Sequence, residues 1–286
     1  MVRGAHHKET MPVELAGKTA VVIGGGGGVG RGVSLGLGAS GMRVVVADID
    51  LESAQAVAVE VVAAGGTAIA SRVDATDRAS LTLLANNAVD TYGAVHVLAN
   101  LCGVITNRRL DEATEAEWAW FFEFNIMAHV RANDVLLPYL RAHGEPAHIM
   151  NTSSMAGLLA LGPELVGGFN NGLYTTTKHA MIGYCDMLRM ELAPEGIGVS
   201  VLCPGLVAGN LGTTSSRNRP ERFGGPTHSP SAGRAPTPGA MPNEVVGPIV
   251  ARAIAANRFY IFTHPNAEMV RARHEQLLED LAFLSE

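Results

Sequence analysis

A run of glycines near the N-terminus constrains the fold of this chain more than any other feature. The stretch Gly24-Gly25-Gly26-Gly27-Gly28-Val29-Gly30 follows an apolar, β-branched segment at residues 19–23 and precedes a helical pattern that starts near Gly28. Glycines let the backbone turn sharply and approach a pyrophosphate, while the start of the helix supplies free N–H groups and the positive end of a dipole. A purely structural turn would look the same, so this motif alone leaves both interpretations open.

An acidic residue favours the nucleotide interpretation. Asp48 ends the next β-branched segment, at residues 43–48. A carboxylate in this place accepts hydrogen bonds from both ribose hydroxyls of a dinucleotide and repels a 2′-phosphate. The sequence therefore predicts a dinucleotide site that takes NAD in preference to NADP.

Short β-branched segments alternate with Ala- and Leu-rich helical patterns along most of the chain, which is typical of βαβ units. The expected strands lie at residues 19–23, 43–47, 67–73, 95–100, 148–152, 198–203 and 258–262. We therefore expect a single α/β domain over residues 13–286, with a doubly wound, Rossmann-type parallel sheet in a three-layer α/β/α arrangement.

Three segments break this alternation. Residues 1–12 are expected to form a flexible tail. Residues 209–243 carry many prolines and arginines and lack a helix or strand period, so we expect a long loop that is either a substrate lid or disordered. Residues 263–286 are expected to form an amphipathic helix that covers the active site or a partner subunit.

Composition excludes several classes of partner. The 27 acidic and 21 basic residues give a net charge of −6, which provides no footprint for nucleic acid. The apolar stretches are too short to span a bilayer and the N-terminus lacks a signal core, so we expect a cytoplasmic protein without a membrane partner. The three cysteines are expected to be reduced core thiols, and the ten histidines lack ligand spacing, so no metal site is expected.

The spacing Gly24-x-x-x-Gly28-x-Gly30 resembles the cofactor turn of the short-chain dehydrogenase/reductase family. Further family motifs recur in the same order over residues 15–208, and a last matching stretch lies at 243–262. Six segments resemble stretches that line the cofactor or the reacting atoms in members of the family. They are Val73-Asp74-Ala75, Asn100-Leu101-Cys102-Gly103, Phe124-Asn125-Ile126, residues 151–157 around Ser154, Tyr174-x-x-x-Lys178 and Pro204-Gly205.

The resemblance implies a set of site residues and a small-molecule substrate. It implies catalytic roles for Asn125, Ser154, Tyr174 and Lys178. It also implies NAD contacts by Gly24, Gly28, Val29, Gly30, Asp48, Ile49, Asp74, Ala75, Asn100, Gly103, Tyr174, Lys178, Pro204 and Val207. By the same resemblance the protein is a homodimer or homotetramer.

The Tyr-x-x-x-Lys spacing has a physical sense of its own, because residues four apart share one face of a helix. An ammonium at Lys178 and the positive charge of an oxidised nicotinamide both favour the phenolate of Tyr174, so Tyr174 is expected to exchange a proton near neutrality. Ser154 is expected to hold the substrate oxygen, with Ser153 as its competitor for that role. By resemblance, Asn125 anchors a water that links Lys178 to solvent.

Several positions depart from the family pattern. Ile23 replaces a threonine that braces the turn, and Leu101-Cys102 replaces Asn-Ala. The segment between Ser154 and Tyr174 is longer than usual and apolar, so it is expected to pass near Tyr174. Gly209 stands where a carboxamide-binding threonine is expected, which leaves the backbone of Val207 to serve.

These observations predict an NAD-dependent oxidoreductase that interconverts an alcohol and its carbonyl. The large loops resemble those of members acting on bulky apolar or aromatic secondary alcohols, such as lignin-derived aryl ethers or steroids and terpenes. The alternatives are a non-catalytic NAD-binding sensor or scaffold, and a dehydratase or epimerase on the same fold. We expect the aromatic residues at 118–124 to pack in the core or at a subunit interface rather than form a substrate box.

Overall fold

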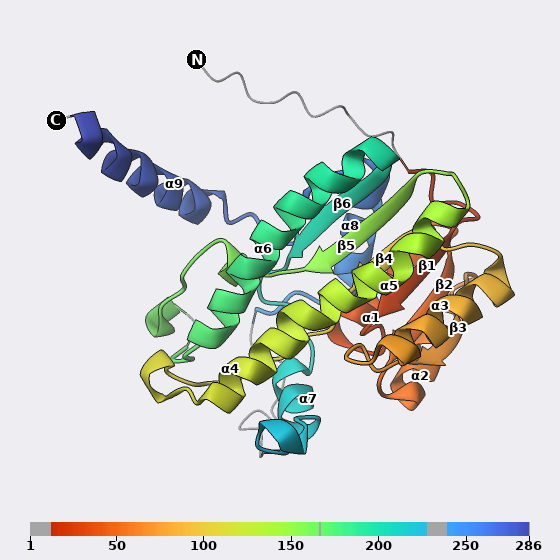
Figure 1. Ribbon diagram of the computed structural model, residues 1–286, viewed down its shortest axis with the longest axis horizontal. Helices are drawn as coiled ribbons and strands as arrows, with labels where there is room; N and C mark the ends of the chain where they lie inside the picture. Colours follow the sequence, from red (N-terminus) through yellow and green to blue (C-terminus); the bar gives the residue numbers. More distant parts are fainter. Residues whose placement is uncertain (1–12, 166, 228–238, 286) are drawn as a thin grey trace.

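The computed structural model describes residues 13–165, 167–227 and 239–285, so the expected tail at residues 1–12 lies outside the described residues. One parallel sheet forms the centre of the molecule, in the order β3-β2-β1-β4-β5-β6-β7 (Figure 1). Its strands are β1 (Thr19–Ile23), β2 (Arg43–Asp48), β3 (Thr67–Arg72), β4 (Val97–Asn100), β5 (Ala147–Thr152), β6 (Ile197–Cys203) and β7 (Tyr260–Phe262). This arrangement confirms the predicted doubly wound, Rossmann-type α/β fold.

Helices cover both faces of the sheet and bury a separate core on each. One core packs α1 (Gly28–Ala39), α2 (Leu51–Ala63) and α8 (Val246–Ala255) on the sheet, and the other packs α3 (Arg78–Tyr92), α5 (Ala128–Ala142) and α6 (Gly172–Leu192). Because side chains alternate along a strand, Val21 of β1 enters one core and Val22 the other. Both faces are therefore buried, which explains why the strands appear in the sequence as continuous apolar runs.

A bent helical segment precedes α5. Helix α4 (Glu115–Phe122) begins with a capping box between Thr114 and Glu117 and leads into a π-helical turn at Glu123–Met127. Trp120 and Phe121 are buried in a small aromatic core, in line with the expectation that they serve packing.

The expectation that residues 209–243 lack regular structure is wrong for part of the segment. Residues Leu211–Arg217 form helix α7, and Glu221–Phe223 form a 3₁₀ turn. The helix has no apolar repeat and is held by a tertiary contact, because the buried Ser215 hydroxyl accepts a hydrogen bond from the Ile105 backbone N–H at 3.0 Å. Residues 228–238 of the expected loop lie outside the described residues.

The C-terminal segment forms helix α9 (Ala267–Ala282) and a short 3₁₀ turn (Phe283–Ser285). The helix projects away from the sheet and its covering helices (Figure 1). No residue of α9 is buried.

Candidate active site

The predicted site residues follow the carboxyl ends of neighbouring strands. The sheet is wound in opposite directions from β1 and from β4, which places a crevice beyond the ends of these two strands. The glycine turn follows β1, Asn100 ends β4, Ser154 follows β5 and Pro204 follows β6. The fold therefore gathers segments that are far apart in the sequence.

The glycine turn is too tight for side chains at its centre. Gly24 has a φ of +78°, and a Cβ atom there would lie 2.9 Å from the backbone nitrogen of Cys102. A Cβ atom on Gly30 would lie 1.9 Å from the carbonyl oxygen of Gly24. Helix α1 starts at Gly28 without a side-chain cap, so its first N–H groups stay available to a ligand. The turn thus fits the pyrophosphate of a dinucleotide.

Two carboxylates stand at the ends of β2 and β3. Asp48 accepts hydrogen bonds from the backbone N–H groups of Gly26 (3.0 Å) and Asp50 (3.1 Å), which fix its carboxylate beside the glycine turn. Asp74 accepts from both the backbone and the hydroxyl of Thr76, at 2.8 and 2.7 Å. Next to these acids, Ile49 is 41% exposed. This edge of the crevice can receive the ribose and base of an adenosine.

The end of β4 meets the centre of the site. The buried Asn100 amide donates to the side-chain oxygens of Asn133 (2.8 Å) and Asn151 (2.9 Å), and its own oxygen has no partner among the described residues. A Cβ atom on Gly103 would lie 2.9 Å from Asn125 Oδ1 and 3.4 Å from the Lys178 ammonium nitrogen. Any side chain at Gly103 would therefore enter the space in front of the catalytic candidates.

The π-helical turn holds Asn125 in the interior. Its Oδ1 accepts a hydrogen bond from the Val104 backbone N–H at 2.7 Å, and its Nδ2 donates to Thr177 Oγ1 at 3.0 Å. These bonds join the segment after β4 to the helix that carries Tyr174 and Lys178. In the described contacts, Asn125 acts as a brace for the site.

The structure separates the two serines that competed for the substrate contact. Ser153 is fully buried and its hydroxyl donates to the Lys178 carbonyl oxygen at 2.7 Å, so it holds helix α6 in place. Ser154 is only partly buried, and its hydroxyl accepts from the Ala156 backbone N–H at 3.1 Å and donates to the Pro204 carbonyl at 3.4 Å. Its greater exposure favours Ser154 as the serine that meets substrate.

Tyr174 and Lys178 lie together on α6. The Lys178 ammonium is buried, donates to the Thr152 carbonyl oxygen at 2.8 Å and lies 5.4 Å from the centre of the Tyr174 ring. Burial raises the pKa of Tyr174 to about 12, although the Ser154 hydroxyl acts in the opposite direction. Burial also lowers the pKa of Lys178 to about 8, although three neighbouring thiols raise it.

These pKa values qualify the expectation that Tyr174 exchanges protons near neutrality. The protein interior disfavours the phenolate more strongly than the Ser154 hydroxyl favours it. The positive charge of an oxidised nicotinamide beside Tyr174 would favour the phenolate.

The last cofactor candidates follow β6. Val207 pairs with Met241 in a short parallel bridge. A Cβ atom on Gly209 would lie 3.1 Å from Gly28 Cα, so the chain passes directly over the glycine turn where the family pattern has a threonine. Asn210 follows, and its side-chain oxygen would lie 3.5 Å from a Cβ atom on Gly27.

Sequence reasoning missed a buried polar network behind Asn100. His129 Nε2 donates to the Cys102 carbonyl oxygen at 2.8 Å, and its Nδ1 lies 3.3 Å from Asn151 Oδ1. The Asn133 amide in turn donates to the Tyr184 hydroxyl at 3.0 Å. The signal was present, because His129 and Asn133 follow Asn125 at four-residue steps on one helix face.

A second missed feature is the docking of the 211–227 segment onto α4. The Arg219 guanidinium stacks 4.7 Å from the centre of the Trp120 ring and lies 3.8 Å from the buried carboxylate of Glu117. Its Nε donates to the Phe223 carbonyl oxygen at 2.7 Å. Phe223 meets Phe124 edge-on at 6.4 Å, and both pack on the aromatic core that Tyr174 also touches. Arg219 therefore holds the turn that carries Phe223 against the same aromatic core that Tyr174 contacts.

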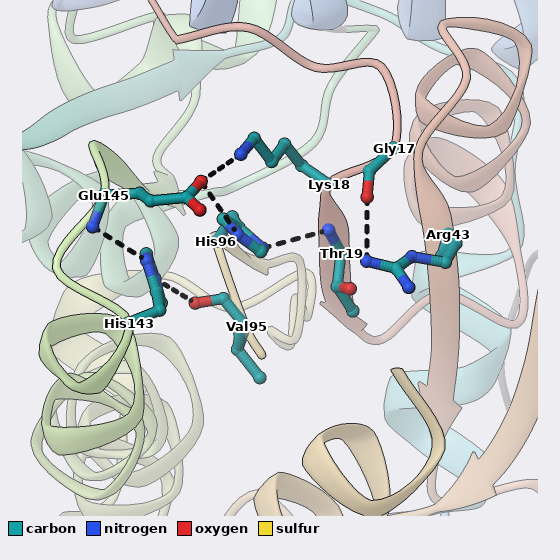
Figure 2. A network of polar contacts seen from close by, with 8 residues as sticks. All are labelled: Gly17, Lys18, Thr19, Arg43, Val95, His96, His143 and Glu145. Atoms are coloured by element: carbon teal, nitrogen blue, oxygen red, sulfur yellow. Dashed lines mark hydrogen bonds and ion pairs between the residues drawn. The ribbon is translucent and has the colours of Figure 1, made fainter. Parts of the chain in front are cut away.

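A polar cluster at the opposite end of the sheet contains His96, His143 and Glu145 (Figure 2). The ring nitrogens and the carboxylate oxygen that could bind a metal ion there lie within 4.8 Å of one another. Nδ1 of His96 accepts from the Thr19 N–H (3.2 Å) and Nδ1 of His143 accepts from the Glu145 N–H (3.1 Å). The other ring nitrogen of each must then carry its hydrogen, and Lys18 pairs with the Glu145 carboxylate. Neither ring keeps a lone pair for a metal, so this group is a hydrogen-bond network beside the Lys18–Glu145 ion pair.

Known proteins are similar to this chain over most of its length. The family model for short chain dehydrogenase matches residues 18–220. A 1-deoxy-11-beta-hydroxypentalenate dehydrogenase of Streptomyces exfoliatus is 31% identical over 212 residues, which cover 73% of this chain and 70% of that protein. The C alpha-dehydrogenase of Sphingobium sp. (strain NBRC 103272 / SYK-6) is 26% identical over 227 residues, 77% of this chain and 72% of that protein.

Solved structures extend the similarity over nearly the whole chain. A short chain dehydrogenase/reductase from Burkholderia phymatum in complex with NAD has a TM-score of 0.81 and 35% identity, and covers 94% of this chain and 96% of that chain. Among the described residues no helix is both long and apolar enough to cross a bilayer. The fold, the ordered motifs and the matching family model together show that this chain is a member of the short-chain dehydrogenase/reductase family of oxidoreductases.

Proposed function

We propose that this protein is an NAD-dependent dehydrogenase that interconverts a secondary alcohol and its ketone, with Tyr174 as the acid/base. The observation that carries the proposal is the convergence of Ser154 and Lys178 on Tyr174, with Lys178 next to Gly103. They lie at the crevice where the glycine turn and Asp48 fit a dinucleotide. Bound NAD would supply the hydride acceptor.

Each side chain has a role that follows from its position. Tyr174 takes the proton of the substrate alcohol in one direction and returns it in the other. Ser154 holds the substrate oxygen by a hydrogen bond as charge develops on it. Lys178, anchored on the Thr152 carbonyl, faces the Tyr174 ring, and its charge favours the phenolate. Asn125 braces the loop after β4 against α6.

Asp48 supports NAD as the coenzyme. Its carboxylate is held at the end of β2 by two backbone N–H groups, in a position to accept from ribose hydroxyls. A 2′-phosphate in the same place would meet a negative charge. The proposal therefore includes a preference for NAD over NADP.

The aromatic side chains near Tyr174 support a bulky apolar or aryl alcohol as substrate. Phe124 and Phe223 form an edge-on pair on the same core as Tyr174, and Arg219 fixes Phe223 there. Such faces favour planar, apolar rings. Two of the relatives are named as dehydrogenases, one of them of a hydroxypentalenate, which accords with oxidation of a hydroxyl group.

The experiment is a measurement of NAD and NADP reduction over a panel of aryl, terpene, steroid and small aliphatic secondary alcohols. The proposal expects turnover with NAD on the larger alcohols and loss of turnover in Tyr174→Phe. Tyr139→Phe is the matched control, because its hydroxyl bonds to Asn86 far from the site. Retained NADH binding without turnover on any alcohol would favour the sensor or scaffold alternative.

The assembly and the cellular location stay predictions from the sequence. We propose a homodimer or homotetramer in the cytoplasm, as the family resemblance implies. The oligomeric state is open to a direct measurement of mass in solution.

A further inference from the structure

Helix α9 carries an apolar stripe that, beyond Val270, is left exposed by the described residues of its own chain. The stripe consists of residues spaced alternately three and four apart, which share one helix face: Ala267, Val270, His274, Leu277, Leu281 and, in the following turn, Leu284. Leu277, Leu281 and Leu284 expose 53%, 59% and 82% of their surface. A helix of this length is marginal in water without tertiary packing, so the stripe calls for a partner.

The pattern of the stripe is that of a coiled-coil seam. Alternate steps of three and four residues place its members at the two core positions of a heptad repeat. His274 occupies one of these positions, where a polar residue fixes the register of pairing at some cost in stability. The partner that such a seam fits is another helix with the same repeat.

The charges beside the stripe identify that helix as a second copy of α9. Arg273 and Asp280 are one heptad apart on the same edge of the stripe. In an antiparallel pair of identical helices this edge faces its own counterpart, so Arg273 of each copy meets Asp280 of the other. In a parallel pair Arg273 would face Leu278 instead, and this charge complementarity would be lost.

We propose that α9 is a dimerisation arm that pairs antiparallel with α9 of a second copy of this chain. The two helices cross between Glu275 and Gln276, which brings His274 beside Leu277 and Val270 beside Leu281 of the other copy. Because the same surface serves on both sides, the contact closes with two-fold symmetry. Val270 also packs on the core of its own chain and so anchors the start of α9. The rest of the helix projects away from the sheet and its covering helices (Figure 1).

Distances between spin labels on the full-length chain test this pairing directly. Gln276→Cys and Phe283→Cys place a label at the same heptad position, off the seam, one heptad apart. With a rise of 1.5 Å per residue, antiparallel pairing adds about 20 Å of axial separation between the two Phe283 labels and almost none between the two Gln276 labels. Equal short distances at both positions would instead show parallel pairing and overturn the proposal. Labelling of the unmodified chain gives the background from its natural cysteines, of which two are buried.

Charge reversal supplies the second test. Arg273→Asp and Asp280→Arg are each expected to lower, at least twofold, the fraction of chains whose spin label at position 276 lies close to the same label on a second copy. The double reversal is expected to restore this fraction. Glu279→Arg is the control, because it makes the same kind of charge change away from the seam. Single reversals without effect, or a short distance that survives Leu277→Glu with Leu281→Glu, would overturn the proposal. An unchanged melting temperature and NADH affinity in these variants would show that the body stays folded.

Discussion

The buried ammonium of Lys178 leads to a prediction in which activity and stability change in opposite directions. Its side chain is 2% exposed, and burial lowers its pKa from 10.5 to about 8. Each pKa unit corresponds to about 1.4 kcal/mol, so the protonated side chain costs the fold about 3 kcal/mol at pH 7. Lys178→Met keeps most of the volume and removes the charge.

The variant also loses the hydrogen bond to the Thr152 carbonyl, which offsets about 1 kcal/mol of the gain. We therefore expect Lys178→Met to be inactive and yet more stable at pH 7, by about 2 kcal/mol, which corresponds to about 4 °C in melting temperature. Thermal and urea unfolding measure both quantities.

The pH dependence separates this cause from improved packing. The folded-state pKa lies below the unfolded one, so the unfolded chain binds the proton more tightly. The penalty is fully present below about pH 8, shrinks as the pH rises through 10.5 and is gone above it, where both states are neutral. Lys18→Met, which removes the partner of Glu145 on the surface, is the control and is expected to be neutral or destabilising. A Lys178→Met variant that is less stable at pH 7, or whose advantage persists at pH 10.5, would refute the reasoning.

Three other predictions concern pH, the substrate and the coenzyme. Burial lowers the pKa of His129 to about 4 and of His148 to about 3. The free energy of unfolding is therefore expected to fall as the pH drops below 6.5, by about 2 kcal/mol for each residue at pH 5. Denaturant unfolding at pH 8 and pH 5 checks this, and equal stabilities would contradict it. Arg219→Met is expected to raise KM for bulky alcohols several-fold with little change in NADH affinity. The control is Arg252→Met, at an exposed position of α8, which is expected to leave KM unchanged; equal effects would show that Arg219 has no special role. Asp48→Asn keeps a hydrogen-bond acceptor but removes the charge, and is expected to raise the ratio of kcat/KM for NADP to that for NAD about tenfold; an unchanged ratio would remove Asp48 from coenzyme selection.

Much of the fold could be predicted because its strands are buried on both faces. Val44, Val45 and Val46 of β2 enter both cores, so they form a continuous β-branched run that is recognisable without an alignment. Helix α7 had no such signal, because Leu211–Arg217 contains no apolar repeat and depends on Ser215 docking against Ile105.

The ionisation of the site was harder to foresee than its residues. The spacing of Tyr174 and Lys178 predicts that they share a helix face, and the structure places them together. The depth of burial is a tertiary property, however, and it raises the pKa of Tyr174 where the sequence suggested a lower value. His129 was missed for a similar reason, since its partners are Asn151 on β5 and the carbonyl of Cys102 after β4, which are distant in the sequence.

In the proposed mechanism Tyr174 transfers the proton at an NAD site. The most direct measurement compares NADH binding and single-turnover NADH oxidation in the unmodified chain and in Tyr174→Phe, with the best ketone found in the panel. We expect NADH dissociation constants within about twofold of each other and a rate at least about 10²-fold lower in the variant. A variant that oxidises NADH as fast as the unmodified chain would contradict the claim.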